Sequence, residues 1–212
     1  MSDWNDAKAV LCRLRPLAGR SLAEPTVRGE YVDGLARLRS LAASLPDHAA
    51  SALRAEQSAL GSGRGDALIA GALAEGITSA RYPGARALLV ALLADPAARA
   101  IREDVVELLG ELGDRDAAPD LMKVLGDPEP WVRAKAADAL GALGHASAGT
   151  ALIRLLEDDS DAVRFRAAEA LGRLRTEAAI PALARLAEHD EDETVRDAAS
   201  DALAALREDL SP

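Results

Sequence analysis

Apolar and polar positions recur with a helical period along most of the chain, and one amphipathic phrase returns four times. The four copies begin at Ile101, Val132, Val163 and Val195, and each has an arginine at its second position. Successive copies start 31, 31 and 32 residues apart. A period of this length is typical of stacked helical pairs, in which each pair buries its apolar side against its neighbours. The pattern therefore predicts a repeat protein and not a chain folded around one core.

Each clear unit contains two helices. An apolar segment leads through a short acidic turn into the repeated helix, as in TALIRLLEDDSDAVR at 150–164. Pro119 and Pro181 stand where a first helix begins, a position at which the missing N–H of proline costs little. Polar turn residues can accept hydrogen bonds from the free N–H groups of the second helix. The candidates for this capping are Asp127, Ser160, Asp161 and Asp192. We predict antiparallel helix pairs and an all-α fold.

The N-terminal part follows the same template less regularly. VRGEYVDGLARL at 27–38 aligns with VRAKAADALGAL at 132–143, and a weaker unit lies at 65–77. Residues 2–14 are expected to form a covering helix. We therefore divide the chain into degenerate helical repeats with their cap at 1–84 and regular repeats at 85–212, joined in one continuous solenoid.

The wording LLxD…VRxxAAxALGxLG resembles the HEAT-repeat family, and more closely its bacterial HEAT-like subgroup first named for phycobilisome lyases. The resemblance covers roughly residues 85–206. It implies a right-handed α-solenoid of stacked antiparallel helix pairs. It also implies that the first helix of each pair lies on the convex side and that the repeated helix lines the concave side.

The exposed face of the repeated helix can be found by counting about 100° per residue. Measured from Val132, Ala136 and Leu140 fall on the core side, whereas Ala134 and Asp138 point the opposite way. The position of Asp138 is acidic in every clear unit. The resulting row consists of Asp33, Glu107, Asp138, Glu169 and Asp201. Three flanking rows vary from unit to unit. They are Glu103, Ala134, Phe165 and Asp197; Asp104, Lys135, Arg166 and Ala198; and Glu111, Ala142, Arg173 and Ala205.

A constant core with variable exposed positions is typical of a binding surface, and we place the candidate partner-binding residues here. Besides the acidic row they are Lys135, Arg166, Arg173, Phe165 and Trp131. Stacked like charges repel, and a basic partner would relieve that repulsion. The alternative is that the charges only keep the array soluble, and that Trp131 and Phe165 only cover the edges of neighbouring repeats.

Other recurring residues favour a structural role. An aspartate precedes the repeated arginine by six positions in three units, as in Asp127 with Arg133. This spacing predicts a ladder in which each arginine binds carboxylates of its own and a neighbouring unit. Gly110, Gly141 and Gly172 occupy one position of the repeated helix, where we expect close helix packing.

The amino-acid composition argues against several classes of function. Acidic residues outnumber basic ones by 35 to 25, and the net charge of −10 opposes a nucleic-acid backbone as the main ligand. The longest uncharged apolar run, at 87–94, is too short to cross a bilayer, and the first residues lack the layout of a secretion signal. We expect a cytoplasmic protein. The single cysteine cannot form an internal disulfide.

No chemical motif accompanies the repeats. His48, His145 and His189 lack the spacing of metal ligands, and nothing groups a nucleophile with a base. The sequence thus predicts no metal site, no cofactor and a non-catalytic adaptor or scaffold that binds a protein or peptide with a basic patch. A bilin lyase-like subunit or chaperone is an alternative. A HEAT-like DNA glycosylase ranks last, because it needs a basic face. The oligomeric state is left open.

Overall fold

The computed structural model describes residues 10, 25–44, 47, 49–50, 52, 64–81 and 84–208. Within these ranges the chain is helical apart from turns and contains no strand. The all-α prediction is therefore confirmed. The covering helix predicted at 2–14 lies outside the described residues, apart from Val10. The chain divides into two compact units, Met1–Leu108 and Leu109–Pro212.

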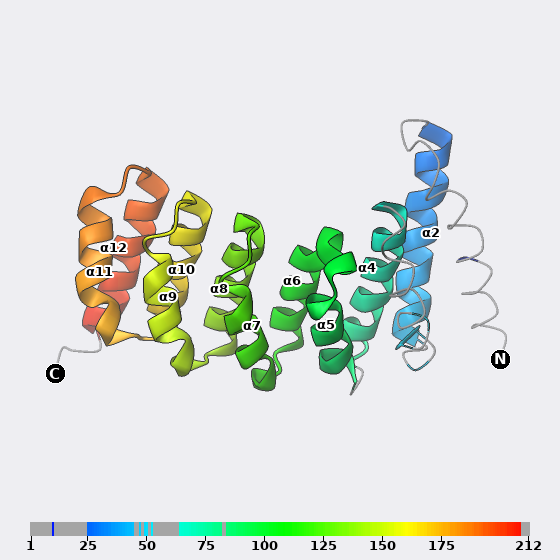
Figure 1. Cartoon of the computed structure of the whole chain (residues 1–212), viewed down its shortest axis with the longest axis horizontal. Coiled ribbons are helices and arrows are strands. Elements are labelled where there is room, and N and C mark those ends of the chain that lie inside the picture. Colours follow the sequence, from blue (N-terminus) through cyan, green and yellow to red (C-terminus); the bar gives the residue numbers. More distant parts are fainter. Residues whose placement is uncertain are drawn as a thin grey trace. The chain divides into compact units, whose positions relative to one another are not determined.

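The first unit is built on a pair of long helices. Helix α2 (Pro25–Ser44) packs along α4 (Arg64–Ser79), and the predicted weak unit at 65–77 forms most of α4. Helix α5 (Ala85–Ala94) and the 3-10 segment η1 (Pro96–Ile101) follow, and the division between the two units falls within α6 (Arg102–Leu112) (Figure 1). Leu38, Leu73 and Leu92 are fully buried in this unit.

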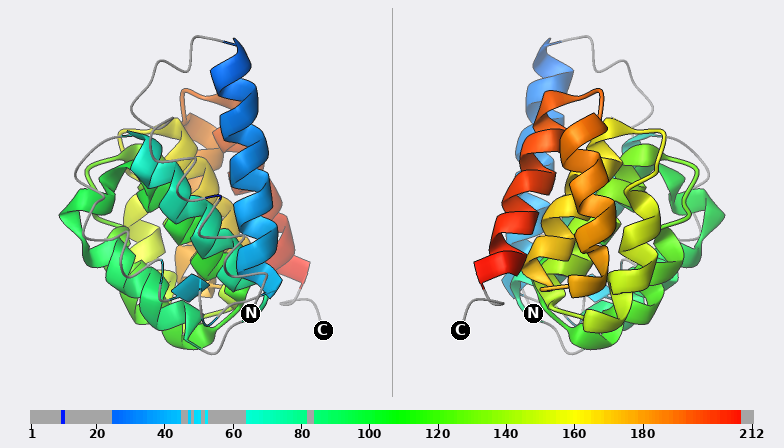
Figure 2. Two further views of the ribbon diagram at one scale, coloured as in Figure 1. Left: turned by 90° about the vertical axis from the view of Figure 1, so that its right-hand side faces the viewer. Right: turned by 90° about the vertical axis from the view of Figure 1, so that its left-hand side faces the viewer.

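The second unit consists of three helix pairs that repeat one design. The pairs are α7 (Ala118–Val124) with α8 (Pro130–Leu143), α9 (Gly149–Leu155) with α10 (Asp161–Arg173), and α11 (Ile180–His189) with α12 (Glu193–Glu208). A 3-10 turn precedes each first helix; these turns are η2 (Arg115–Ala117), η3 (Ala146–Ala148) and η4 (Glu177–Ala179). Figure 2 shows the last pair side by side, as an antiparallel hairpin. The pairs and their connections match the repeat predicted from the sequence.

Local chemistry sets where these helices begin and end. Pro119 and Pro181 lie in the first turn of α7 and α11, as predicted. Gly144 ends α8 in the left-handed conformation with φ 65°, which glycine adopts without strain. Arg175 holds the equivalent position after α10 with φ 52°. Its Nη1 donates a hydrogen bond to the carbonyl oxygen of Ala205, 2.8 Å away. This bond ties the strained turn to the next repeat.

The predicted capping residues differ in what they do. Asp192 accepts hydrogen bonds from the N–H groups of Thr194 and Val195 at the start of α12, as expected. The Oδ1 atom of Asp127 accepts from the N–H of Glu129, one residue before α8. Ser160 precedes α10 but makes no side-chain capping bond, so that prediction was wrong. The Oδ1 atom of Asp158 instead accepts the N–H of Ser160 and shapes the turn.

The second helices of the three pairs form one closely packed layer. Helix α10 packs against both α8 and α12, whereas the described first helices have few contacts with one another. A Cβ atom added to Gly141 would lie 2.9 Å from the Cα and Cβ atoms of Ala170. One added to Gly172 would lie 3.1 Å from the same atoms of Ala202. Close packing at these glycines is therefore confirmed. We call the solvent-accessible side of α8, α10 and α12 the second-helix face.

Candidate partner-binding surface

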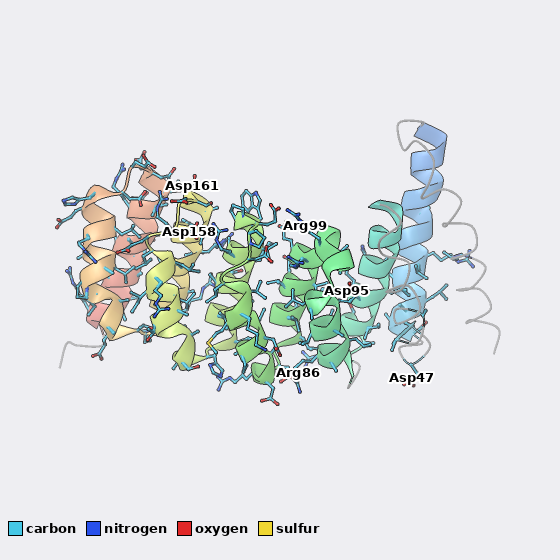
Figure 3. All side chains as sticks on the ribbon, viewed as in Figure 1. Asp47, Arg86, Asp95, Arg99, Asp158 and Asp161 are labelled. Carbon is cyan, nitrogen blue, oxygen red and sulfur yellow. The ribbon has the colours of Figure 1, made fainter. Side chains whose placement is uncertain are left out.

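The repeated arginines connect neighbouring repeats at the level of the turns. Arg133 donates hydrogen bonds from Nε and Nη2 to the two carboxylate oxygens of Asp158, at 2.8 and 2.7 Å. Arg164 binds Asp190 in the same bidentate manner, at 2.7 and 2.9 Å. Figure 3 labels Asp158 in the turn before α10. The predicted ladder between adjacent units is confirmed for these two steps.

The bond of each arginine within its own unit differs from the prediction. Nη1 of Arg133 donates to the carbonyl oxygen of Asp127, and Nη1 of Arg164 donates to that of Asp158, both at 2.9 Å. Nη1 of Arg196 likewise bonds the carbonyl oxygen of Asp190 at 2.7 Å. The side chain of each of these aspartates accepts an N–H of its own turn, and those of Asp158 and Asp190 also bind the arginine of the preceding repeat. The arginine therefore joins a backbone in one repeat to a carboxylate in the next.

The ladder is largely removed from solvent. The side chains of Arg164 and Asp190 are 10% and 5% exposed. The hydrogen bond from Arg164 holds the pKa of Asp190 below its ordinary value. Burial by itself raises the pKa of Asp158, but the hydrogen bonds from Arg133 and Ser160 outweigh it and bring that pKa below its ordinary value. Charges that are buried and fully paired hold the repeats together and are not available to a partner.

Three members of the predicted acidic row lie on the second-helix face. Asp138 belongs to α8, Glu169 to α10 and Asp201 to α12. The side chains of Asp138 and Glu169 are 38% and 29% exposed, and Asp201 is exposed. These carboxylates are thus accessible and are not buried between the helix layers. Asp33 and Glu107 are exposed residues of the first unit, and their alignment with the other three stays a prediction.

Two arginines of α10 partly neutralise this row. Nη1 of Arg173 donates to Oδ1 of Asp138 at 2.6 Å, and its Nη2 lies 3.7 Å from Oε2 of Glu169. Nη1 of Arg166 donates to the same oxygen of Glu169 at 2.8 Å. The sequence placed Glu169 beside both arginines on one helix, but the bond from Arg173 to Asp138 crosses to the neighbouring helix. Asp201 and Asp197, in contrast, form no ion pair with any described residue.

Phe165 stands between two open hollows in this face. The first, the Trp131 hollow, has a volume of about 420 Å³. It is lined by Trp131, Ala134, Lys135, Asp161, Ala162, Phe165, Arg166 and Thr194. The second, the Asp201 hollow, has a volume of about 480 Å³. It is lined by Phe165, Glu169, Gly172, Arg173, Thr194, Asp197, Ala198, Asp201, Ala202 and Ala205. The guanidinium carbon of Arg166 lies 5.3 Å from the centre of the Phe165 ring, a cation–π distance.

The structure therefore brings together most of the predicted binding residues of the second unit. Trp131 is 62% exposed, and no other described large apolar side chain is as accessible. It also borders the next repeat, since Asp161 and Ala162 line the same hollow. Two flanking positions were predicted wrongly: Ala134 and Ala198 are only 3% and 7% exposed. They are covered because adjacent second helices approach closely, so only part of the outward arc of each helix meets solvent.

The described residues offer no other evident chemistry. Among them, no group of histidine, cysteine or acidic side chains is arranged to hold a metal ion. A search of the same residues finds no helix with the length and apolar character needed to span a membrane.

Solved structures of other proteins resemble this chain, among them the following three. The complex of CpcE and CpcF of phycocyanin lyase from Nostoc sp. PCC7120 matches with 29% identity and a TM-score of 0.60, over 66% of this chain and 60% of that one. A designed armadillo repeat protein in complex with the peptide (KR)4 matches with 23% identity and a TM-score of 0.56, over 91% and 99%. An engineered protein matches with 20% identity and a TM-score of 0.51, over 82% and 92%. The last two support the fold alone.

Comparison of sequences gives the family. A search of curated proteins found no match. The family model for HEAT repeats matches residues 58–131 and 119–204, which together make up well over half of the chain. The all-α solenoid fold, the stacked helix pairs and this match agree, and the chain belongs to the HEAT-repeat family.

Proposed function

We propose that this HEAT-repeat chain is a non-catalytic scaffold that binds a protein or peptide partner on its second-helix face. Asp138, Glu169 and Asp201 would contact basic side chains of the partner. The proposal rests on a difference in exposure between two sets of carboxylates. The ladder carboxylates that build the array are buried and paired, whereas carboxylates of three successive second helices are accessible on one face.

Ion pairs with these carboxylates alone would contribute too little free energy to hold a partner. An exposed ion pair contributes only about 0–1 kcal/mol, and Arg173 and Arg166 already compete for Asp138 and Glu169. A partner must therefore add apolar contact, for which Phe165 and Trp131 are the accessible aromatic groups. Aromatic side chains in hollows commonly dominate the binding energy of an interface. The carboxylates would then favour basic partners over acidic ones and speed the encounter.

The test is affinity capture from the native lysate with the whole chain as bait. The triple variant Asp138→Lys, Glu169→Lys and Asp201→Lys is expected to lose the partners that the unchanged chain recovers. A matched control, Glu157→Lys, Glu177→Lys and Glu188→Lys, makes the same change in net charge at exposed positions outside the second helices. It should retain those partners. Capture that survives in the first variant, with both variants folded by circular dichroism, would show that the row only confers solubility.

The likeness to a phycocyanin lyase complex favours a second candidate, a bilin lyase-like subunit or chaperone. In that role the second-helix face would cradle a tetrapyrrole during its attachment to another protein. Titration of the chain with a bilin distinguishes the two candidates. A saturable shift of the bilin absorbance that is lost in Phe165→Ala supports the lyase-like role, and an unchanged spectrum removes it.

A further inference from the structure

The hollows on either side of Phe165 differ in chemistry. Two cationic side chains, Lys135 and Arg166, border the Trp131 hollow, and its exposed aromatic group has no equivalent in the other. The Asp201 hollow has three carboxylates at its rim, those of Glu169, Asp197 and Asp201, against one cation, Arg173, and its floor includes the small residues Ala198 and Ala202. Arg166 packs over the Phe165 ring and lines only the first hollow. Phe165 lines both hollows, so its side chain is the shared border of an aromatic hollow and an acidic one.

The acidic hollow is suited to the side chain of a lysine or arginine. Asp197 and Asp201 are four residues apart on α12, where like charges destabilise a helix. Neither forms an ion pair with a described residue. A long basic side chain could lay its methylene stem on the alanine floor and bring its charge to these carboxylates. A cation is thus the ligand that this hollow complements in both shape and charge.

The aromatic hollow is suited to an apolar side chain. Trp131 is 62% exposed and forms one side of it, and the buried Ala134 forms part of its floor. Covering an exposed tryptophan with an aliphatic group removes apolar surface of both partners from water, which favours binding. The rim carries two cationic groups, Lys135 and Arg166, against one carboxylate, Asp161, and this balance disfavours a second basic side chain here.

The shared wall sets the spacing between the two side chains. Groups in van der Waals contact with opposite sides of one ring lie about 7–8 Å apart, twice the usual contact distance of about 3.5–4.0 Å. Residues i and i+2 of an extended segment lie about 7 Å apart and point to the same side. An extended strand with an apolar residue followed two positions later by a basic one fits this separation.

We propose that the second-helix face recognises an extended protein segment of the form apolar-x-basic, with the apolar side chain in the Trp131 hollow and the Lys or Arg in the Asp201 hollow. This inference rests on the proposed scaffold function and names the partner that the scaffold would take. Phe165 borders both hollows and serves as the central anchor, and in the Trp131 hollow the apolar side chain would lie beside the guanidinium of Arg166, which packs over the ring.

The probe is the peptide Ac-Ser-Leu-Ser-Lys-Ser-amide, with two matched controls in which Gln replaces the Lys or Ser replaces the Leu. The full chain carries Trp4→Phe, so that Trp131 is its only tryptophan. Binding is followed by tryptophan fluorescence and by ¹⁵N-resolved NMR. We expect saturable binding by the first peptide, with shifts at the Trp131 indole N–H and at the amides of α12. Each control peptide should bind about 10-fold more weakly.

Variants of the chain test each hollow. Phe165→Ala should weaken binding by about 10-fold or more. Asp197→Asn with Asp201→Asn should weaken the Lys peptide about 3- to 10-fold and leave the Gln peptide unchanged. Asp197 and Asp201 are exposed and Phe165 is partly exposed, and Trp131→Ala offers a second aromatic deletion at a more exposed position. Circular dichroism melting confirms folding.

Three outcomes overturn the inference: no saturable binding at millimolar peptide, equal affinity for all three peptides, or shifts confined to α7, α9 and α11. In each of these cases, the dependence of the captured partners on the triple variant is judged separately. Partners that still depend on Asp138, Glu169 and Asp201 would leave the scaffold function standing and reject only the segment proposed here. If the peptide does not bind as proposed and the captured partners also do not depend on Asp138, Glu169 and Asp201, the scaffold function is rejected as well.

Discussion

Two arginines of α10 that are separated by a single residue have different roles. Arg164 points between repeats, where its guanidinium binds Asp190 and two backbone carbonyl oxygens. Arg166 lies on the second-helix face, pairs with Glu169 and stacks on Phe165. Their side chains are 10% and 44% exposed. Residue type does not distinguish the two, but the helical phase does, because residues two apart on a helix point about 200° apart.

This difference gives the first prediction. Arg164→Ala should lower the free energy of unfolding by about 3 kcal/mol, because it leaves the carboxylate of Asp190 buried without its partner. Arg166→Ala is the matched control and should cost about 0–1 kcal/mol, because its ion pair is exposed to solvent. Urea unfolding followed by circular dichroism measures both. Similar small losses in the two variants would contradict a structural role for the ladder.

At the scale of elements, close packing of the second helices depends on glycine. Gly141→Ala should destabilise the chain by about 1–3 kcal/mol, the usual cost of overpacking. The reason is that the new methyl group would lie 2.9 Å from the Ala170 backbone, which cannot move without shifting α10. The preference of helices for alanine, about 1 kcal/mol over glycine, acts in the opposite direction.

Gly71→Ala provides a control of opposite sign. Gly71 also lies inside a helix, α4, but an added Cβ atom would meet nothing within 4 Å. The substitution should therefore stabilise the chain by up to about 1 kcal/mol through helix propensity alone. Thermal melting of both variants is the measurement. A gain in stability from Gly141→Ala would show that α8 and α10 separate more easily than their packing indicates.

The sequence pattern predicted the positions of the helices better than it predicted which side chains are exposed and how they pair. The period of the repeat located the helix pairs, and the recurring Gly141 and Gly172 indicated where helices approach. Counting angles around one helix could not foresee the burial of Ala134 and Ala198, because that depends on the distance to the next helix. Nor could it foresee the bond from Arg173 to Asp138, since a long arginine side chain reaches across that same short distance.

At the scale of the whole molecule, the acidic excess serves two separate purposes. The chain carries a net charge of −10, yet the carboxylates of Asp158 and Asp190 are matched by arginines inside the ladder. The repeated sequence motif made this ladder predictable, because its aspartates and arginines recur at one spacing. It did not separate exposed charges that bind a partner from those that confer solubility, because both kinds satisfy the same amphipathic pattern.

The repeated ladder predicts how the molecule responds to acid. The pKa values of Asp158 and Asp190 are lowered in the folded state by their arginine partners, whereas both are about 3.9 in an unfolded chain. Between these values the unfolded chain binds more protons, so the stabilisation is complete above about pH 5 and is lost as the pH falls through and below about 4. Each group contributes a slope of the unfolding free energy of at most about 1.4 kcal/mol per pH unit.

Asp190→Asn should therefore be less stable than the unchanged chain at pH 7 but should lose less stability between pH 5 and pH 3. Urea midpoints measured across this range test the prediction, and parallel acid losses in the two proteins would mean that carboxylates outside the ladder control the response.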